Sequence, residues 1–200
     1  MPSFEELENP NSSLATEIYT SDSVILGTYF YQENRSRVEF SELTSYLPDA
    51  LVSTEDERFY QHSGIDFRGL ARAIVKLGKG GGASTITQQL AKNLFNKGGS
   101  SSTLKRLTQK VKEYIVATKL ERQYTKNEII AMYLNTQGFL FNAIGIRSAS
   151  RIYFGKEPKD LDVQESAILV AMLKNPRQFN PNREISKKIS LTRRNVVFAQ

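Results

Sequence analysis

The chain contains no cysteine and no tryptophan, and it has a single histidine among its 200 residues. The absence of cysteine excludes disulfide bonds and thiolate metal sites. The sequence also lacks a run of about 18 apolar residues, which a membrane-spanning helix requires, and it shows no signal-peptide segment. We therefore expect the chain as given to be soluble or peripheral to a membrane.

The sequence does contain enough apolar material for a folded core, since 40% of its residues are hydrophobic and 10% are aromatic. Its length suits one domain, or one domain with a small appendage. Lysine and arginine number 27 against 21 aspartates and glutamates, which gives a net charge of +6. This charge favours an anionic partner, whether a nucleic acid, an acidic lipid or a phosphorylated substrate, without choosing among them.

The residue pattern predicts a mainly α-helical chain with a small β element near its N-terminus. Residues 15–19 and 24–31 are rich in β-branched and aromatic side chains around a polar turn, which is typical of a β-hairpin. A further short strand is predicted at residues 38–40. Apolar spacing, caps and breakers predict helices over the following ranges: 47–59, 67–77, 84–93, 103–122, 126–134 and 162–174.

The helix over residues 103–122 is the longest, and it is predicted to bury one apolar stripe. The members of this stripe recur at helical spacing: Leu104, Leu107, Val111, Tyr114, Ile115 and Thr118. The glycine- and serine-rich residues 98–102 just before it are predicted to form a mobile loop.

The most informative segment is residues 84–93, STITQQLAKN, which follow three glycines at 80–82. Ser84 or Thr85 can cap a helix here, because a hydroxyl accepts from the first unpaired N–H groups. A helix N-terminus with the nearby Lys92 suits a phosphate or pyrophosphate. An ordinary surface helix with a good cap explains the same pattern, and spacing alone leaves both interpretations open.

An upstream segment gives this helix a family context. Residues 55–66, EDERFYQHSGID, followed by residues 84–93, resemble the first two motifs of the peptidoglycan glycosyltransferases. These domains occur in bifunctional penicillin-binding proteins and in monofunctional transglycosylases. Two further motifs are matched by 110–113 with Ala117, Leu120 and Glu121, and by 165–167 through Asn175-Pro176 to 179–181. The resemblance runs in order from about Ser41 to the C-terminus.

The resemblance implies a lysozyme-like, two-lobed helical fold whose smaller lobe faces the membrane. It implies that residues 1–40 are the linker and β-hairpin segment after a membrane anchor, and that residues 41–200 are the glycosyltransferase domain. Because residues 193–198 have the pattern of a helix interior, we expect an excised domain. In this expectation the full-length parent has a membrane anchor before the domain and a transpeptidase domain after it, and the excised domain lacks both.

One motif departs from the family pattern. Asn135, Gly145-Ile146 and residues 153–155 match it, but Leu140 stands where glycine is expected. Gln109 likewise precedes Lys110 where many members have arginine. We expect the fold and the reaction to be kept and the geometry of the loop at residues 138–141 to differ.

Two carboxylates are implied at the active site. The resemblance makes Glu55 the catalytic base, since glycosyl transfer needs a group that takes a proton from the acceptor hydroxyl. It makes Glu113 a second active-site carboxylate that helps to bind the leaving pyrophosphate or steadies positive charge at the sugar, and the candidate ligand of a divalent cation, Mg²⁺ or Mn²⁺. The alternatives are a solvated helix end for Glu55 and an ordinary salt bridge to Lys110 for Glu113.

The neighbours of these carboxylates have predicted roles as well. Asp56 and Arg58 are expected to hold the loop through ion pairs, and His62 to order it rather than to catalyse. Four cations are expected around the diphosphate: Arg72, Lys92, Lys110 and Lys112. Five polar side chains are expected to bind sugar hydroxyls or phosphate oxygens, with a structural role equally open for Thr85 and Gln89: Ser84, Thr85, Gln88, Gln89 and Asn93.

The implied function is polymerisation of lipid II into a glycan strand, by inverting glycosyl transfer with loss of undecaprenyl pyrophosphate, at the extracytoplasmic face of the bacterial membrane.

Six apolar residues are candidates for a membrane-facing surface, with core packing as the alternative for each: Leu94, Phe95, Phe139, Leu140, Phe141 and Ile144. Two other functions stay open, namely a lysozyme-like muramidase that uses Glu55 as an acid and a catalytically silent scaffold. A nucleic-acid partner is not expected, because the basic residues lack interleaved stacking aromatics.

Overall fold

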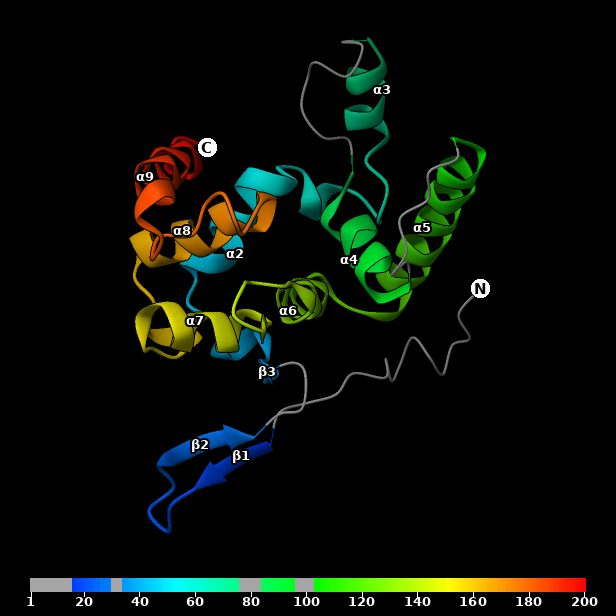
Figure 1. Cartoon of the computed structure of the whole chain (residues 1–200). Coiled ribbons are helices and arrows are strands. Elements are labelled where there is room, and N and C mark those ends of the chain that lie inside the picture. The colour runs from blue at the N-terminus through cyan, green and yellow to red at the C-terminus, as the bar shows by residue number, and fades with distance from the viewer. Residues whose placement is uncertain (1–15, 30–33, 76–83, 96–102) are drawn as a thin grey trace. The chain divides into compact units, whose positions relative to one another are not determined.

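The computed structural model describes residues 16–29, 34–75, 84–95 and 103–200, and these are mostly helical (Figure 1). The chain divides into two compact units. The first comprises the described residues of Leu51–Tyr133, and the second those of Asn11–Ala50 and Leu134–Gln200. The mainly α fold with a small N-terminal hairpin is confirmed, whereas the predicted boundary between residues 40 and 41 stays a prediction.

The hairpin lies in the second unit. Strands β1 (Thr16–Tyr19) and β2 (Ile25–Tyr29) are antiparallel, as predicted. The predicted strand at residues 38–40 is wrong. Glu39 and Glu42 form a capping box there, with Glu39 N donating to Glu42 Oε2 at 2.8 Å, and this closes a short 3₁₀ turn, η1 (Phe40–Glu42). A two-residue strand, β3 (Asn34–Arg35), instead pairs in parallel with β4 (Ala143–Ile144).

Helices make up the first unit. They are the end of α2 (Tyr46–Glu55), η2 (Phe59–Gln61), α3 (Phe67–Val75), α4 (Ile86–Phe95), α5 (Thr103–Gln123) and most of α6 (Lys126–Thr136). Helices α4 and α5 pack side by side (Figure 1). The core of the unit consists of apolar side chains from these elements: Phe59, Ile86, Leu90, Val116, Ala117, Leu120, Ile129 and Ile130. The glycine cluster at 80–82 and the loop at 98–102 lie outside the described residues.

The apolar stripe predicted for α5 is wrong. Leu107, Val111 and Ile115 are 65%, 49% and 37% exposed, and Leu104 lies outside the residues whose side chains are described. The buried face instead carries Glu113, Val116, Ala117 and Leu120. A Cβ on Gly64 would lie only 3.0 Å from the backbone of Ala117. The lack of a side chain at Gly64 therefore allows the backbone of α5 to approach it closely at Ala117.

The second unit is completed by α7 (Ile146–Phe154), η3 (Pro158–Asp160), α8 (Val163–Lys174) and α9 (Glu184–Phe198). Helix α8 packs against α9 and is almost wholly buried from Ser166 to Met172. Asp162 and Glu165 form the predicted capping box, and α8 ends at Lys174, just before Asn175-Pro176, as predicted.

Ion pairs to two arginines of α7 hold the hairpin and the 3₁₀ turns of this unit. Arg151 Nη1 lies 2.6 Å from Glu17 Oε1, and Arg151 Nε lies 2.6 Å from Glu157 Oε1. Arg147 pairs with Glu42 and Glu157. Burial works against the charge of Glu17, but hydrogen bonds from Tyr19, Arg151 and Ser36 outweigh it and lower the pKa of Glu17 from 4.5 to about 2.

The lowered pKa of Glu17 predicts an acid-sensitive hairpin. A carboxylate whose pKa is depressed on folding stabilises the fold above its unfolded pKa of 4.5, and that stability is lost as the pH falls towards 2. We expect the Tm to drop further between pH 5 and 3 than in a Glu17→Gln variant, measured by circular dichroism at matched salt. Parallel pH profiles for the two proteins would show that the ion pair contributes nothing.

The loop that departs from the family pattern forms a tight turn. Ala143 N donates to Leu140 O at 3.1 Å, and both central residues have positive φ, 57° for Phe141 and 60° for Asn142. This is the arrangement of a type I′ turn, in which asparagine is well tolerated and phenylalanine is not. Phe141 is 62% exposed, whereas Phe139 is 1% exposed. Phe139 therefore belongs to the core, and its membrane-facing alternative is wrong.

The left-handed backbone at Phe141 predicts an inverted order of stability between two variants. Phe141→Gly and Phe141→Ala lose the same aromatic ring, but only alanine keeps the steric cost of positive φ. We expect the glycine variant to be more stable by about 1 kcal/mol in urea unfolding, the reverse of the order in a helix or strand. An alanine variant at least as stable would show that this turn is not strained.

Candidate active site

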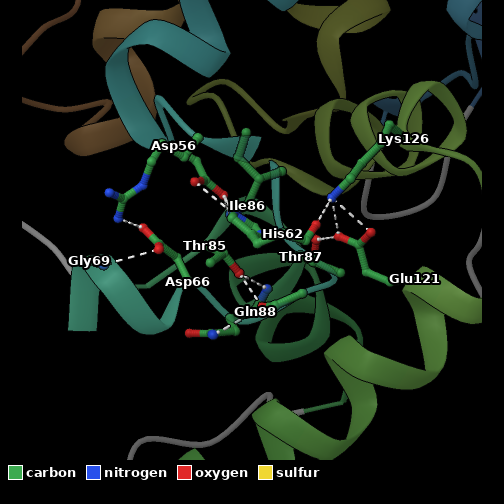
Figure 2. A network of polar contacts seen from close by, with 12 residues as sticks. Asp56, His62, Asp66, Gly69, Thr85, Ile86, Thr87, Gln88, Glu121 and Lys126 are labelled. Atoms are coloured by element: carbon green, nitrogen blue, oxygen red, sulfur yellow. Dashed lines mark hydrogen bonds and ion pairs between the residues drawn. The ribbon is translucent and has the colours of Figure 1, made fainter. Parts of the chain in front are cut away.

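The beginning of α4 is fixed by side chains from the preceding loop. Thr85 Oγ1 accepts from Gln88 N at 3.2 Å, which confirms the predicted cap, and donates to Gly64 O at 2.7 Å (Figure 2). Ile86 N donates to Asp56 Oδ2 at 3.0 Å. The first N–H of α4 is thus taken by a carboxylate of the protein, and a phosphate site at this helix end stays a prediction.

The loop after Glu55 is held by two pairs, as predicted. His62 Nε2 lies 3.0 and 3.2 Å from the two carboxylate oxygens of Asp56, and both side chains are more than nine-tenths buried. Arg58 pairs with Asp66, whose other oxygen accepts from Gly69 N at 3.0 Å (Figure 2). Burial opposes the charge of Asp66, but the guanidinium of Arg58 lowers its pKa.

Glu55 ends α2 and is half-buried. Gln89 Nε2, from α4, donates to Glu55 Oε2 at 3.1 Å. On its other side, Gln89 Oε1 accepts from the hydroxyl of Tyr133 at 3.0 Å. Tyr133 is missing from the sequence-based set, because nothing in the pattern of the helix over 126–134 marks its hydroxyl.

The second carboxylate, Glu113, lies on the covered face of α5 and is 6% exposed. Lys110 Nζ lies 2.6 Å from Glu113 Oε2 and 3.0 Å from Ser84 Oγ. The salt bridge considered for this pair is therefore present, and its carboxylate is buried. Lys110 joins the segment just before α4 to this enclosed negative charge, where an ion pair is screened less than on the surface.

The remaining predicted residues separate into buried and exposed groups. Thr85 and Gln88 are each 2% exposed, and both side chains donate to Gly64 O. These contacts give them a structural role, and a role in substrate binding stays a prediction. The exposed group comes from three helices, and its role in binding the substrate stays a prediction: Arg72 from α3, Lys92 and Asn93 from α4, and Lys112 from α5.

A further, partly buried cluster ties three helices together and was not predicted. Lys126 Nζ, from α6, lies 2.8 Å from Glu121 Oε2 of α5 and donates to His62 O at 2.7 Å. Thr87, from α4, donates to Glu121 Oε1 (Figure 2). The side of α4 that carries Thr87 is thereby anchored, and Gln89 projects from the same helix.

The described residues hold no group of three or more histidine, aspartate or glutamate side chains that could bind a metal by themselves. Glu113 is one carboxylate, and Lys110 already pairs with it. Such a donor set fits Mg²⁺ only where substrate phosphate oxygens complete the coordination, as is common for this ion.

Comparison with known proteins gives the family. Residues 22–200 match the transglycosylase family, so the chain belongs to that family and is a glycosyltransferase domain, as predicted. Among the described helices, none combines the length and the apolar character needed to cross a bilayer.

Similar proteins carry the name of penicillin-binding proteins. The chain is 43% identical over 155 residues to penicillin-binding protein 1F of Bacillus subtilis, covering 76% of this chain and 21% of that protein. It is 37% identical over 199 residues to penicillin-binding protein 1A of Haemophilus influenzae, covering 98% and 22%. The crystal structure of the latter aligns with a TM-score of 0.44 at 21% identity, over 93% of this chain and 18% of that one. The chain thus spans about a fifth of the length of these relatives.

Proposed function

We propose that the chain polymerises lipid II, an undecaprenyl-pyrophosphoryl disaccharide-pentapeptide, in bacterial cell wall synthesis. One observation carries the proposal: a single segment, residues 84–89, contacts one predicted carboxylate directly and is linked to the other through Lys110. Gln89 donates to Glu55, and Ser84 accepts from Lys110, which pairs with Glu113. A base for the acceptor sugar and a cation for the leaving group are the two requirements of this transfer.

In the proposed reaction, Glu55 Oε1 takes the proton of the 4-hydroxyl of the acceptor's N-acetylglucosamine. The oxygen attacks the anomeric carbon of the donor's N-acetylmuramic acid as the bond to the diphosphate breaks. The configuration at that carbon changes from α to β, and undecaprenyl pyrophosphate leaves with the bonding electrons. Lys110 stabilises the negative charge that builds on the diphosphate, together with the exposed cations Arg72, Lys92 and Lys112.

A divalent cation forms part of the proposal. Glu113 would supply one carboxylate ligand, and the substrate diphosphate the others. The cation, Mg²⁺ or Mn²⁺, would neutralise charge on the leaving group when bound.

The proposal also includes the location of the domain in the cell and the longer protein to which it belongs. The substrate and the growing glycan strand lie at the extracytoplasmic face of the bacterial membrane, so the domain works at a membrane surface. The relatives are about five times longer than this chain, which supports a longer parent with a transpeptidase domain.

One pair of assays distinguishes the proposed polymerase from a lysozyme-like muramidase. The purified chain is incubated in detergent with labelled lipid II and Mg²⁺, and in parallel with labelled preformed cell wall. The proposal predicts polymer from lipid II and no new reducing ends from the wall. New reducing ends without polymer would establish a muramidase, and neither product from the folded protein would support a silent scaffold.

A further inference from the structure

We propose that Tyr133 is a positioning residue for the predicted base: through the side-chain amide of Gln89 it holds Glu55 in the orientation that accepts a proton. The inference rests on the proposed function, because it takes Glu55 as the base. In this proposal the Tyr133 hydroxyl orients Glu55 through Gln89, to which it donates.

Three side chains from three elements form one continuous line of hydrogen bonds. The Tyr133 hydroxyl, from α6, donates to Gln89 Oε1 at 3.0 Å. Gln89 Nε2, from α4, donates to Glu55 Oε2 at the end of α2 at 3.1 Å. All three residues belong to the first compact unit.

The chemistry of the three groups allows one arrangement of this line. An ionised carboxylate only accepts hydrogen bonds, so the Gln89 amide must turn its NH₂ towards Glu55. Its oxygen then faces Tyr133, where it needs a donor. A hydroxyl supplies that donor, and it fixes the amide against a flip that would set its oxygen against the carboxylate.

Burial keeps the donor in place. Tyr133 is 1% exposed, while Gln89 and Glu55 are half-buried, so the line runs from the interior towards solvent. Burial, and after it the charge of Glu55, raise the pKa of Tyr133 above its usual value. The hydroxyl therefore stays protonated and remains a donor.

The line also selects one oxygen of the base. Among the described residues, Gln89 is the hydrogen-bond partner of Glu55, and it takes Oε2. Oε1 is then left for the acceptor hydroxyl. Without the Tyr133 hydroxyl, the amide and the carboxylate both gain rotational freedom, and the base spends less time in the reactive orientation.

The test compares Tyr133→Phe, Gln89→Met and the double variant in lipid II polymerisation. We expect Tyr133→Phe to lower kcat roughly tenfold with KM within about twofold, because the lost hydrogen bond orients the base and does not bind substrate. In the Gln89→Met background, the same change should alter kcat by less than about twofold. A wild-type kcat for Tyr133→Phe, or an equal loss in both backgrounds, would overturn the inference.

Tyr153→Phe is the matched control. Tyr153 is a buried tyrosine of the second unit whose hydroxyl has no hydrogen-bond partner among the described residues. Its removal should leave kcat unchanged. An equal loss of kcat in Tyr153→Phe and Tyr133→Phe would show that removing any buried hydroxyl lowers the activity. It would contradict a specific effect of the hydrogen bonds that join Tyr133 to Glu55.

A second measurement is independent of activity. The side-chain NH₂ resonances of Gln89, identified by their absence in Gln89→Met, should shift in Tyr133→Phe and in Glu55→Gln, and should not shift in Tyr153→Phe. These shifts in a protein that makes no polymer would contradict the proposed function and leave the hydrogen-bonded line standing. Unmoved resonances in Tyr133→Phe would overturn the line itself.

Discussion

Glu55→Gln is expected to lower the rate of lipid II polymerisation at least about a hundredfold, because a positioned general base contributes roughly that factor or more. The amide cannot take a proton from the acceptor hydroxyl at working pH. Its carbonyl still accepts from Gln89, so the fold and the loop after α2 should be preserved. Initial rates with labelled lipid II, measured beside the Tm, separate lost chemistry from lost structure.

The matched control is Glu57→Gln, two residues further along the same acidic run. Glu57 is exposed, in contrast to the half-buried Glu55 and the buried Asp56. The charge change is identical, so a long-range electrostatic effect would lower the rate of both variants. We expect Glu57→Gln to polymerise at close to the parent rate, and equal losses would contradict Glu55 as the base.

Lys110→Met is expected to cost about a hundredfold in kcat, the usual effect of removing one fixed group that stabilises transition-state charge. The substitution keeps the length and apolar stem of the side chain but removes the ammonium group between Ser84 and Glu113. It also leaves the buried carboxylate of Glu113 without its cation, so a lower Tm is expected. Single-turnover release of the diphosphate measures the chemical step directly.

A second variant separates these two effects of Lys110. In Lys110→Met with Glu113→Gln, the uncompensated buried charge is gone, and the Tm should recover towards that of the parent. The rate should not recover, because the cation is still missing. Lys105→Met removes an exposed lysine near the start of the same helix and should change neither quantity. A double variant that regains full activity would show that Lys110 only neutralises Glu113.

Local signals in the sequence predicted the elements that depend on few neighbouring residues. The cap of α6 is an example, since Thr125 N donates to Glu128 Oε2 at 2.7 Å within one turn. The capping box at Asp162 and the end of α8 before Asn175-Pro176 were likewise predicted from neighbouring residues. The Lys110–Glu113 pair was also foreseeable, because residues three apart on a helix are neighbours.

Features that join distant parts of the chain could not be predicted in this way. The covered face of α5 lies close to Gly64, from a distant part of the chain, whereas the stripe predicted through Leu107 and Val111 is exposed. Likewise, Tyr133 meets Gln89 from another helix, and Asp56 caps α4 from the preceding loop. No spacing rule within a single element reveals such contacts.

The most direct test of the proposed reaction measures undecaprenyl pyrophosphate released by the chain from lipid II, beside lipid II whose acceptor 4-hydroxyl is blocked. A polymerase that uses Glu55 as base should release about one diphosphate for each new β-linked bond, and almost none from the blocked substrate. Equal release from both substrates would mean that water is the acceptor, which would contradict glycan polymerisation by this domain.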